Sequence, residues 1–254
     1  MPELYLGLDL GTSGARALVI NIEGQIRAEG KSAMADHGPN HRSPAVWWAA
    51  TETALRSALS GVDPLDIRAL AVDGTSGTML PIDADGAPLA DGLMYNDACD
   101  DAALLARISA VSPETTAARG ATSGLARAVR LSSFNPVQVI HQADWISGRF
   151  SGLWVSDENN ALKTGYDPVA GAWPSWVEQV IDPDMLPKVA APGHAIGVVG
   201  QNDFGLSPSC RVVAGTTDGC ASFLATGAQA AGDGVSALGT TLTIKLLSDS
   251  PVFA

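Results

Sequence analysis

The sequence predicts an α/β fold with a mixed β-sheet that is flanked by helices. The chain opens with two short apolar runs on either side of a polar turn, which favours an antiparallel hairpin. An apolar pattern of helical spacing separates this hairpin from a further apolar run, so a helix is expected between strands. The chain has 254 residues, 46% of them hydrophobic, which is enough to bury a sizeable core.

The first third of the chain supplies a meander, a helix and a buried strand. We expect a hairpin turn over 21–24, and strands over 4–8, 17–20 and 25–30. Pro44 suits a helix start, and Gly61 should follow the helix end. The run over 67–72 is predicted to be a buried strand with a polar turn just past its end. Because ligands bind at the carboxyl ends of such strands, this turn is a candidate substrate wall.

The rest of the chain alternates between helical and strand patterns. We expect helices over 97–108, 136–150 and 220–228, and strands over 211–214, 234–238 and 242–247. Three tryptophans lie in irregular sequence that is punctuated by Pro and Gly: Trp154, Trp173 and Trp176. Core packing is the first interpretation of these side chains, and a sugar-stacking platform is the second.

The composition excludes several classes of protein. The net charge is −12, from 15 basic and 27 acidic residues, and such a surface repels the phosphate backbone of nucleic acid. Cys99, Cys210 and Cys220 form no CxxC pair, so neither a disulfide framework nor structural zinc is predicted. The chain opens without a signal peptide, and no apolar run approaches the roughly 20 residues of a membrane span. We therefore expect a cytoplasmic protein that binds neither nucleic acid nor membrane.

An internal repeat predicts the domain organisation. The pattern of residues 10–20, a Gly-Thr turn between a strand end and an apolar strand, returns in residues 238–247. The second copy has the character of the opening hairpin of a second, homologous domain. We therefore expect a first domain over 1–233, and over 234–254 the beginning of a mostly missing one. Two such domains place two Gly-Thr turns across a cleft, where both can hold one nucleotide triphosphate.

The first turn carries groups that suit phosphoryl transfer. Asp9 ends the first strand and is a candidate ligand of Mg²⁺ through water, because Mg²⁺ keeps much of its hydration shell. Gly11, Thr12 and Ser13 offer backbone amides and hydroxyls to phosphate oxygens. The alternative for this segment is an ordinary hairpin with a capping aspartate.

A second carboxylate suits the role of a general base. Asp218 follows the strand and turn that end in Thr217, just before a predicted helix. A carboxylate beside a helix N-terminus stays ionised at neutral pH, so Asp218 can accept the proton of a sugar hydroxyl. The alternative is an N-cap aspartate that satisfies free amide groups, which is compatible with catalysis.

Three segments together resemble the FGGY carbohydrate kinases, such as xylulokinase, ribulokinase and glycerol kinase. They are Asp9-Leu10-Gly11-Thr12-Ser13-Gly14, Gly215-Thr216-Thr217-Asp218 and Leu238-Gly239-Thr240-Thr241. The resemblance implies a ribonuclease H-like domain of the actin-like ATPase class, with ATP and Mg²⁺ as cofactors. It implies that Asp9 is the metal-associated aspartate and Asp218 the catalytic base. It also implies a second phosphate loop at Gly239, Thr240 and Thr241.

The resemblance places the sugar contacts in two segments. The candidates are Thr75, Ser76, Gly77, Asn96 and Asp97, together with Asp218. Xylulokinases resemble one another in a Gln-Met-His stretch at the first segment, which this chain lacks. The departure is similar to the D-ribulose kinase branch, so a small ketopentose is expected, D-ribulose first and D-xylulose second.

Two further polar residues belong to a run that the D-ribulose kinase branch also carries. Asp157 and Asn160 are weaker candidates for sugar contacts, and a loop-capping role is equally open for each.

Three other functions share parts of these sequence patterns. An actin-like or chaperone-like ATPase with a binding or structural role shares the first turn. A base aimed at a sugar hydroxyl, here Asp218, together with a polar pocket at Thr75 to Thr78 distinguishes a sugar kinase from it. A phosphatase with Asp9 as nucleophile needs a second aspartate where Gly11 stands. A dinucleotide enzyme needs a different glycine spacing and a helix after the turn. The sequence leaves open the sugar, a homodimer and whether residue 254 is a natural end.

Overall fold

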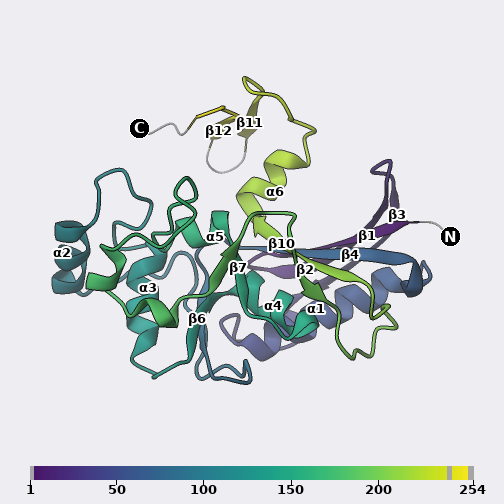
Figure 1. Cartoon of the computed structure of the whole chain (residues 1–254). Coiled ribbons are helices and arrows are strands. Elements are labelled where there is room, and N and C mark those ends of the chain that lie inside the picture. The colour runs from purple at the N-terminus through teal and green to yellow at the C-terminus, as the bar shows by residue number, and fades with distance from the viewer. Residues whose placement is uncertain (1–2, 239–241, 251–254) are drawn as a thin grey trace.

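The computed structural model of the chain describes residues 3–238 and 242–250. Its centre is a six-stranded mixed sheet with the order β3-β2-β1-β4-β10-β9 (Figure 1). The strands are β1 (Leu4–Leu10), β2 (Gly14–Asn21), β3 (Ile26–Ala33), β4 (Ile67–Gly74), β9 (Ala195–Val198) and β10 (Arg211–Thr217). The predicted antiparallel meander is confirmed in β1 to β3, while β1, β4 and β10 run parallel.

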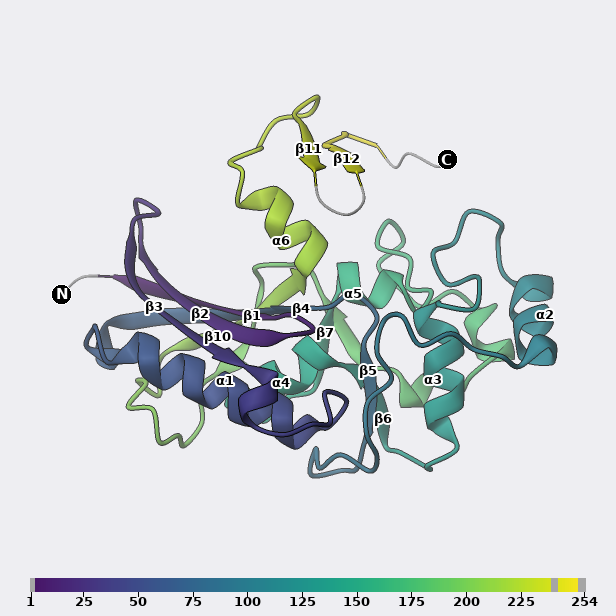
Figure 2. The same cartoon turned by 180° about the vertical axis from the view of Figure 1, so that it is seen from behind.

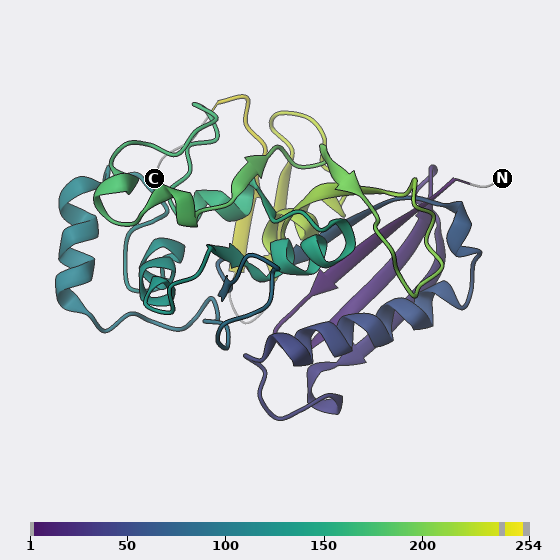
Figure 3. The ribbon, with the colours of Figure 1, turned by 60° about the horizontal axis from the view of Figure 1, so that its bottom comes forward.

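One face of the sheet carries two helices. Alternate residues of β1 are apolar and buried, and they pack on α1 (Pro44–Leu59) and α4 (Gln142–Ser151) in one core. Figures 1 and 3 show both helices on the same side of the sheet. The short helix α6 (Asp218–Leu224) follows β10 and lies on the opposite side. The predicted helix start at Pro44 and end before Gly61 are confirmed.

A second, smaller core lies beside the sheet. It packs α2 (Ala102–Val111) and α3 (Gly124–Ser132) around the hairpin of β5 (Met79–Ile82) and β6 (Gln138–His141). The remaining elements are β7 (Val155–Asp157), α5 (Glu158–Leu162), β8 (Lys188–Ala190) and the 3-10 turns Met34–Asp36, Pro64–Asp66, Val177–Gln179 and Pro183–Met185. The side chains of Trp154, Trp173 and Trp176 pack against the two cores, as the first interpretation expected.

The helix predicted over 136–150 is wrong in its first part. Residues 138–141 form β6, which pairs with β5, and the helix begins only at Gln142. The apolar pair Val139 and Ile140 is fully buried in this hairpin, so a long-range pairing decides what a short apolar run leaves ambiguous. The helix predicted over 97–108 begins later, at Ala102, because Asp101 caps it through the amide of Leu104.

The last part of the described chain stands apart from the main sheet. The helix predicted over 220–228 is α6, which begins and ends earlier. β11 (Gly234–Leu238) and β12 (Leu242–Leu246) form a separate two-stranded sheet beyond α6 (Figures 1 and 2). The turn between them, with the predicted phosphate contacts Gly239, Thr240 and Thr241, lies outside the described residues. Within the described ranges, no helix is both long and apolar enough to span a membrane.

Candidate active site

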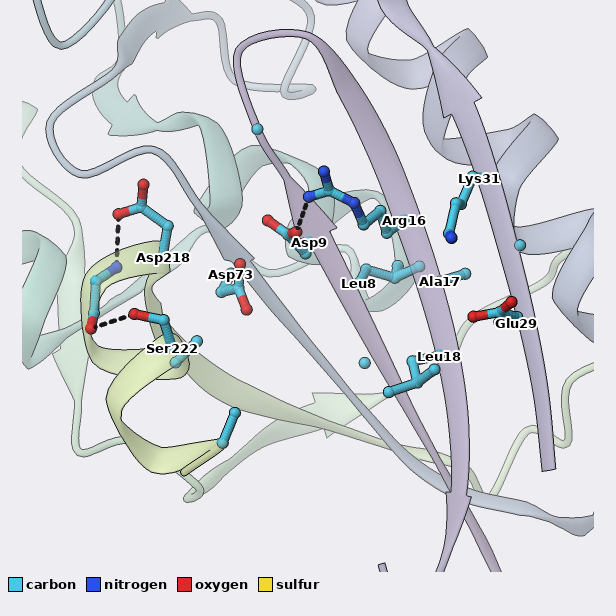
Figure 4. Close-up of a pocket in the computed structure, with 16 residues that line it drawn as sticks. Leu8, Asp9, Arg16, Ala17, Leu18, Glu29, Lys31, Asp73, Asp218 and Ser222 are labelled. Carbon is cyan, nitrogen blue, oxygen red and sulfur yellow. Dashed lines mark hydrogen bonds and ion pairs between the residues drawn. The ribbon is translucent and has the colours of Figure 1, made fainter. Parts of the chain in front are cut away.

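An open cavity of about 650 Å³ lies where the parallel strands β1 and β4 end, next to α6. Besides Glu29 on β3, three aspartates line it: Asp9, Asp73 and Asp218. Figure 4 shows Asp73 between the other two. The structure therefore brings together the predicted metal-associated aspartate and the predicted base, and adds a carboxylate that the sequence interpretation had not singled out.

Strand register explains why these carboxylates meet. Asp9 on β1 is the register partner of Asp73 on β4. Asp73 is in turn the partner of Thr216 on β10, and Asp218 begins the helix that follows this strand. The carboxyl ends of parallel strands meet at one edge of a sheet, so residues far apart in sequence share one site.

Asp9 is held by an ion pair across the first hairpin. Its Oδ2 accepts a hydrogen bond of 2.7 Å from Nη1 of Arg16, and the two residues are register partners on β1 and β2. The pair is well exposed to solvent, so it orients the carboxylate more than it stabilises the fold. The sequence interpretation missed Arg16, although pairing the predicted hairpin around its turn would have set it opposite Asp9.

Asp73 has an environment that disfavours its charged form. Burial, followed by the nearby charge of Asp9 and the charge of Asp218, raises the pKa of Asp73 to about 8. Its Oδ1 is buried and has no hydrogen-bond partner among the described residues. The sequence interpretation ended the strand at Val72 and began the polar turn at Gly74, and so passed over the residue between them.

Asp218 is an exposed carboxylate at the start of α6. Its Oδ1 accepts a hydrogen bond of 2.7 Å from the amide of Gly219. The N-cap interpretation of Asp218 is wrong, because Thr217 is the cap and its Oγ1 accepts from the amide of Cys220 at 3.3 Å. Asp218 is instead the first helical residue, where the free amides of the first turn favour a negative charge.

The predicted phosphate turn is a tight connection between β1 and β2. The amide of Gly11 donates to the carbonyl of Gly14 at 3.0 Å, and Gly11 lines the cavity. Thr12 and Ser13 are exposed and do not line the cavity. Their hydroxyls are accessible to a ligand that lies outside this cavity.

The first candidate sugar segment follows directly from the end of β4. The hydroxyl of Thr75 is buried and engaged within the protein, at 2.6 Å from Oγ1 of Thr78 and 3.2 Å from Oε1 of Gln142. In contrast, Oγ of Ser76 is buried without a partner among the described residues. Gly77 is buried and has a positive φ of 84°, which favours glycine.

The second candidate segment is only partly available to a ligand. Asn96 is exposed. The carboxylate of Asp97 accepts from Arg42 Nη2 at 2.5 Å and from the amide of Met94 at 2.8 Å, so both of its oxygens have partners. Neither sugar segment lines the 650 Å³ cavity, although Gly74 at the end of β4 is the register partner of Thr217 beside Asp218.

Asp157 and Asn160 are engaged in capping. Asp157 is the N-cap of α5 and accepts from the amides of Asn159 and Asn160 at 2.9 and 3.0 Å. Nδ2 of Asn160 donates to the same carboxylate at 2.7 Å, and both side chains are almost fully buried. Burial, followed by the charge of Asp144, raises the pKa of Asp157. This arrangement favours the capping role for Asp157, whereas Oδ1 of Asn160 is buried without a partner among the described residues.

Comparison with known proteins shows which family the chain resembles. Residues 4–104 match the model of the N-terminal domain of the FGGY family of carbohydrate kinases. Xylulose kinases from Streptomyces rubiginosus and Streptomyces coelicolor are 25% and 27% identical to the chain over 95% and 96% of its length. The resemblance of the chain to the FGGY carbohydrate kinases is therefore confirmed. The chain spans about half the length of these curated relatives, 53% and 54%.

The fold of the chain is that of solved sugar kinases. The structure of xylulose kinase from Rhodospirillum rubrum superposes with a TM-score of 0.86 at 22% identity, over 99% of this chain and 56% of the other. The expected fold class, an α/β domain of the actin-like ATPase type with helices flanking a mixed sheet, is therefore confirmed.

The carboxylates of the candidate site suit a hard cation held through water. Among the described residues, no group of three or more His, Cys, Asp or Glu is arranged to enclose a metal ion directly. Asp9 offers carboxylate oxygens at the cavity wall, and Mg²⁺ favours oxygen ligands while it retains several waters. One or two carboxylates together with nucleotide phosphates are a usual set of ligands for Mg²⁺.

Proposed function

We propose that this chain is the sugar-binding part of an ATP-dependent kinase that phosphorylates a hydroxyl of a small sugar. The observation that carries the proposal is the exposed carboxylate of Asp218, which shares one cavity with Asp9 and Gly11. A base, a metal-associated carboxylate and a phosphate turn are the parts that phosphoryl transfer to an alcohol needs.

Each residue has a defined role in the proposed reaction. Asp218 accepts the proton of the attacking sugar hydroxyl, and its exposure leaves room for the sugar to approach. Asp9 would hold a hydrated Mg²⁺, which would shield the charge of the ATP phosphates, and Arg16 keeps the carboxylate of Asp9 in place. Gly11, with Thr12 and Ser13, contacts phosphate oxygens through amides and hydroxyls.

The proposed domain division follows from the proposed kinase function. We assign residues 1–233 to the sugar-binding domain and residues 234–254 to the opening hairpin of a second ATPase domain. Two observations support this division: β11 and β12 form their own small sheet, and the chain spans about half of its relatives. Lys245 on β12 also donates to Oγ of Ser222 on α6 at 3.4 Å, which links the hairpin to the cavity wall.

The proposed substrate is a ketopentose, D-ribulose before D-xylulose. Several of the matching curated relatives are xylulose kinases, which supports a ketopentose, and others are glycerol kinases. The hydroxyl of Ser76 is buried without a partner among the described residues, and we assign it as the sugar contact at the place where xylulokinases carry Gln-Met-His. The choice of D-ribulose rests on this departure from the xylulokinase pattern. A buried hydroxyl discriminates strongly between sugars because the wrong one leaves it unpaired.

The test is a thermal-shift comparison of D-ribulose, D-xylulose and glycerol at equal concentration. A ligand present at about 100 times its Kd stabilises a protein by about 2.7 kcal/mol, which is a readily measured shift. We expect the largest shift with D-ribulose. A larger increase in melting temperature with D-xylulose or glycerol reverses the choice of sugar. If none of the three compounds raises the melting temperature, the proposal is overturned.

A further inference from the structure

A buried arginine contacts both candidate sugar segments. Arg127 lies on α3, and its side chain is only 1% exposed, which is rare for a charged residue. It forms no ion pair within the described ranges. Its guanidinium donates instead to four backbone carbonyls.

These four carbonyls belong to three separate loops. Nε donates to Gly77 at 2.7 Å, and Nη2 donates to Thr122 at 2.8 Å. Nη1 donates to Tyr95 at 3.0 Å and to Asp97 at 3.3 Å. The loop of Gly77 also contains Ser76, and the loop of Tyr95 and Asp97 also contains Asn96. One side chain therefore joins both candidate sugar segments.

The chemistry of the guanidinium suits this role. Its five N–H donors lie in one plane and are fixed in direction, so it sets the relative positions of several acceptors at once. Burial lowers the pKa of Arg127 to about 10, which leaves the group charged at neutral pH. A buried charge is costly unless it is hydrogen-bonded, and the four carbonyls meet this requirement.

The glycine opposite Arg127 supports the same interpretation independently. A Cβ atom at Gly77 would lie 2.7 Å from Nη2 of Arg127, and its φ of 84° is one that other residues rarely adopt. The close approach of the guanidinium to the turn therefore depends on a residue without a side chain. The amide of Tyr95 also donates to Oγ1 of Thr78 at 3.1 Å, so the two segments are linked directly as well.

We infer that Arg127 is a positioning residue for sugar selectivity, which fixes the turn of Ser76 and Gly77 relative to the segment of Tyr95 to Asp97. The inference rests on the proposed function, because it concerns the same sugar site. Arg127 has no part in proton or phosphoryl transfer. Its effect is on where the hydroxyl of Ser76 and the amide of Asn96 stand when a sugar arrives.

The test compares sugar affinities of the Arg127→Lys and Gly77→Ala variants with those of the unaltered chain. Lysine keeps the charge but loses the planar set of donors, and alanine displaces the guanidinium from the other side. Arg130→Lys is the matched control, because Arg130 is on the same helix and donates to the carbonyl of Ala98 at 3.3 Å. Circular dichroism and melting temperature report whether each variant is folded.

We expect both variants to bind D-ribulose at least ~10-fold more weakly, as expected when buried polar groups lose their partners. The ratio of D-ribulose to D-xylulose affinity should fall towards one, and the control should keep both affinities. A purely structural role lowers the melting temperature but leaves this ratio unchanged, and that result overturns the inference. So does unfolding of both variants. If the unaltered chain binds neither sugar, the proposed function fails and the inference fails with it.

Discussion

At the scale of single residues, the three aspartates of the cavity differ in their surroundings. Asp9 is paired with Arg16, and Asp218 is exposed at the first turn of α6. Asp73 stands between them, and burial raises its pKa to about 8. Unequal environments let neighbouring carboxyl groups hold different protonation states at one pH, which is how acid and base roles are separated in one site.

The first prediction concerns the proposed base. In a protein that includes the second domain, Asp218→Asn should lower turnover by at least ~10²-fold with little change in sugar affinity, as expected for a general base. Steady-state kinetics and calorimetric sugar binding measure the two quantities separately. Near-normal turnover would remove Asp218 from the mechanism.

The second prediction concerns Asp73 and pH. Its pKa is about 8 in the folded chain against 3.8 for an unperturbed group, so between these values the folded state binds a proton that the unfolded state does not. The free energy of unfolding should therefore fall as pH rises from about 4 to about 8. Asp73→Asn should remove this fall, with a gain of at least ~1 kcal/mol at pH 8 relative to the unaltered chain.

Chemical denaturation at pH 5 and pH 8 in the presence of EDTA measures this effect. The two proteins should differ less at pH 5 than at pH 8, because Asp73 is still protonated there. An equal difference at both pH values would mean that Asp73 has an ordinary pKa in the folded chain.

At the scale of the elements, local sequence patterns predicted some segments and not others. The helix over 44–59 was predictable because its apolar spacing, its first-turn proline and the glycine beyond its end agree. The strand β6 was not predictable, because four residues are too few to show a periodicity. Whether they form a strand or a helix depends on pairing with β5. Arg127 was passed over for the same reason, since only the folded loops reveal what it binds.

The third prediction tests the capping role of Asp157 at the start of α5. Asp157→Ala should destabilise the chain by about 1–3 kcal/mol, because it leaves buried donors of Asn159 and Asn160 without an acceptor. Sugar affinity should change by less than about 2-fold, since capping energies act on the fold. A large loss of sugar affinity without loss of stability would restore Asp157 as a sugar contact.

At the scale of the whole molecule, the sequence predicted Asp9 and Asp218 through motifs, yet it did not predict Asp73 as their neighbour. Each motif is local, whereas the meeting of β1, β4 and β10 is a property of the sheet. The register that joins Asp9 to Asp73 spans more than sixty residues of intervening chain, and no local pattern encodes it. The parallel order of these strands supplies the missing information.

The fourth prediction concerns the activity of the 254-residue chain by itself. We expect it to bind sugar but to phosphorylate it very slowly, because it spans about half the length of its relatives and ATP would be held from one side only. Holding two reactants in the right orientation lowers a reaction barrier by up to about 7–11 kcal/mol. Most of this contribution requires that ATP is held from both sides. Calorimetry with sugar and a coupled ADP assay measure the two properties. Sugar-dependent ADP release at an ordinary kinase rate would show that one side suffices.

The order of β1, β4 and β10 has a consequence for the direction of the reaction. Hydrogen-bonded strands stand about 4.8 Å apart, and β4 lies between the strand of Asp9 and the strand that leads to Asp218. In the proposed reaction the ATP phosphates belong near Asp9 and the attacking hydroxyl near Asp218. In that arrangement the line from the phosphates to the hydroxyl crosses the end of β4, perpendicular to the strands, and backbone hydrogen bonds set the separation of the strands that carry the two aspartates.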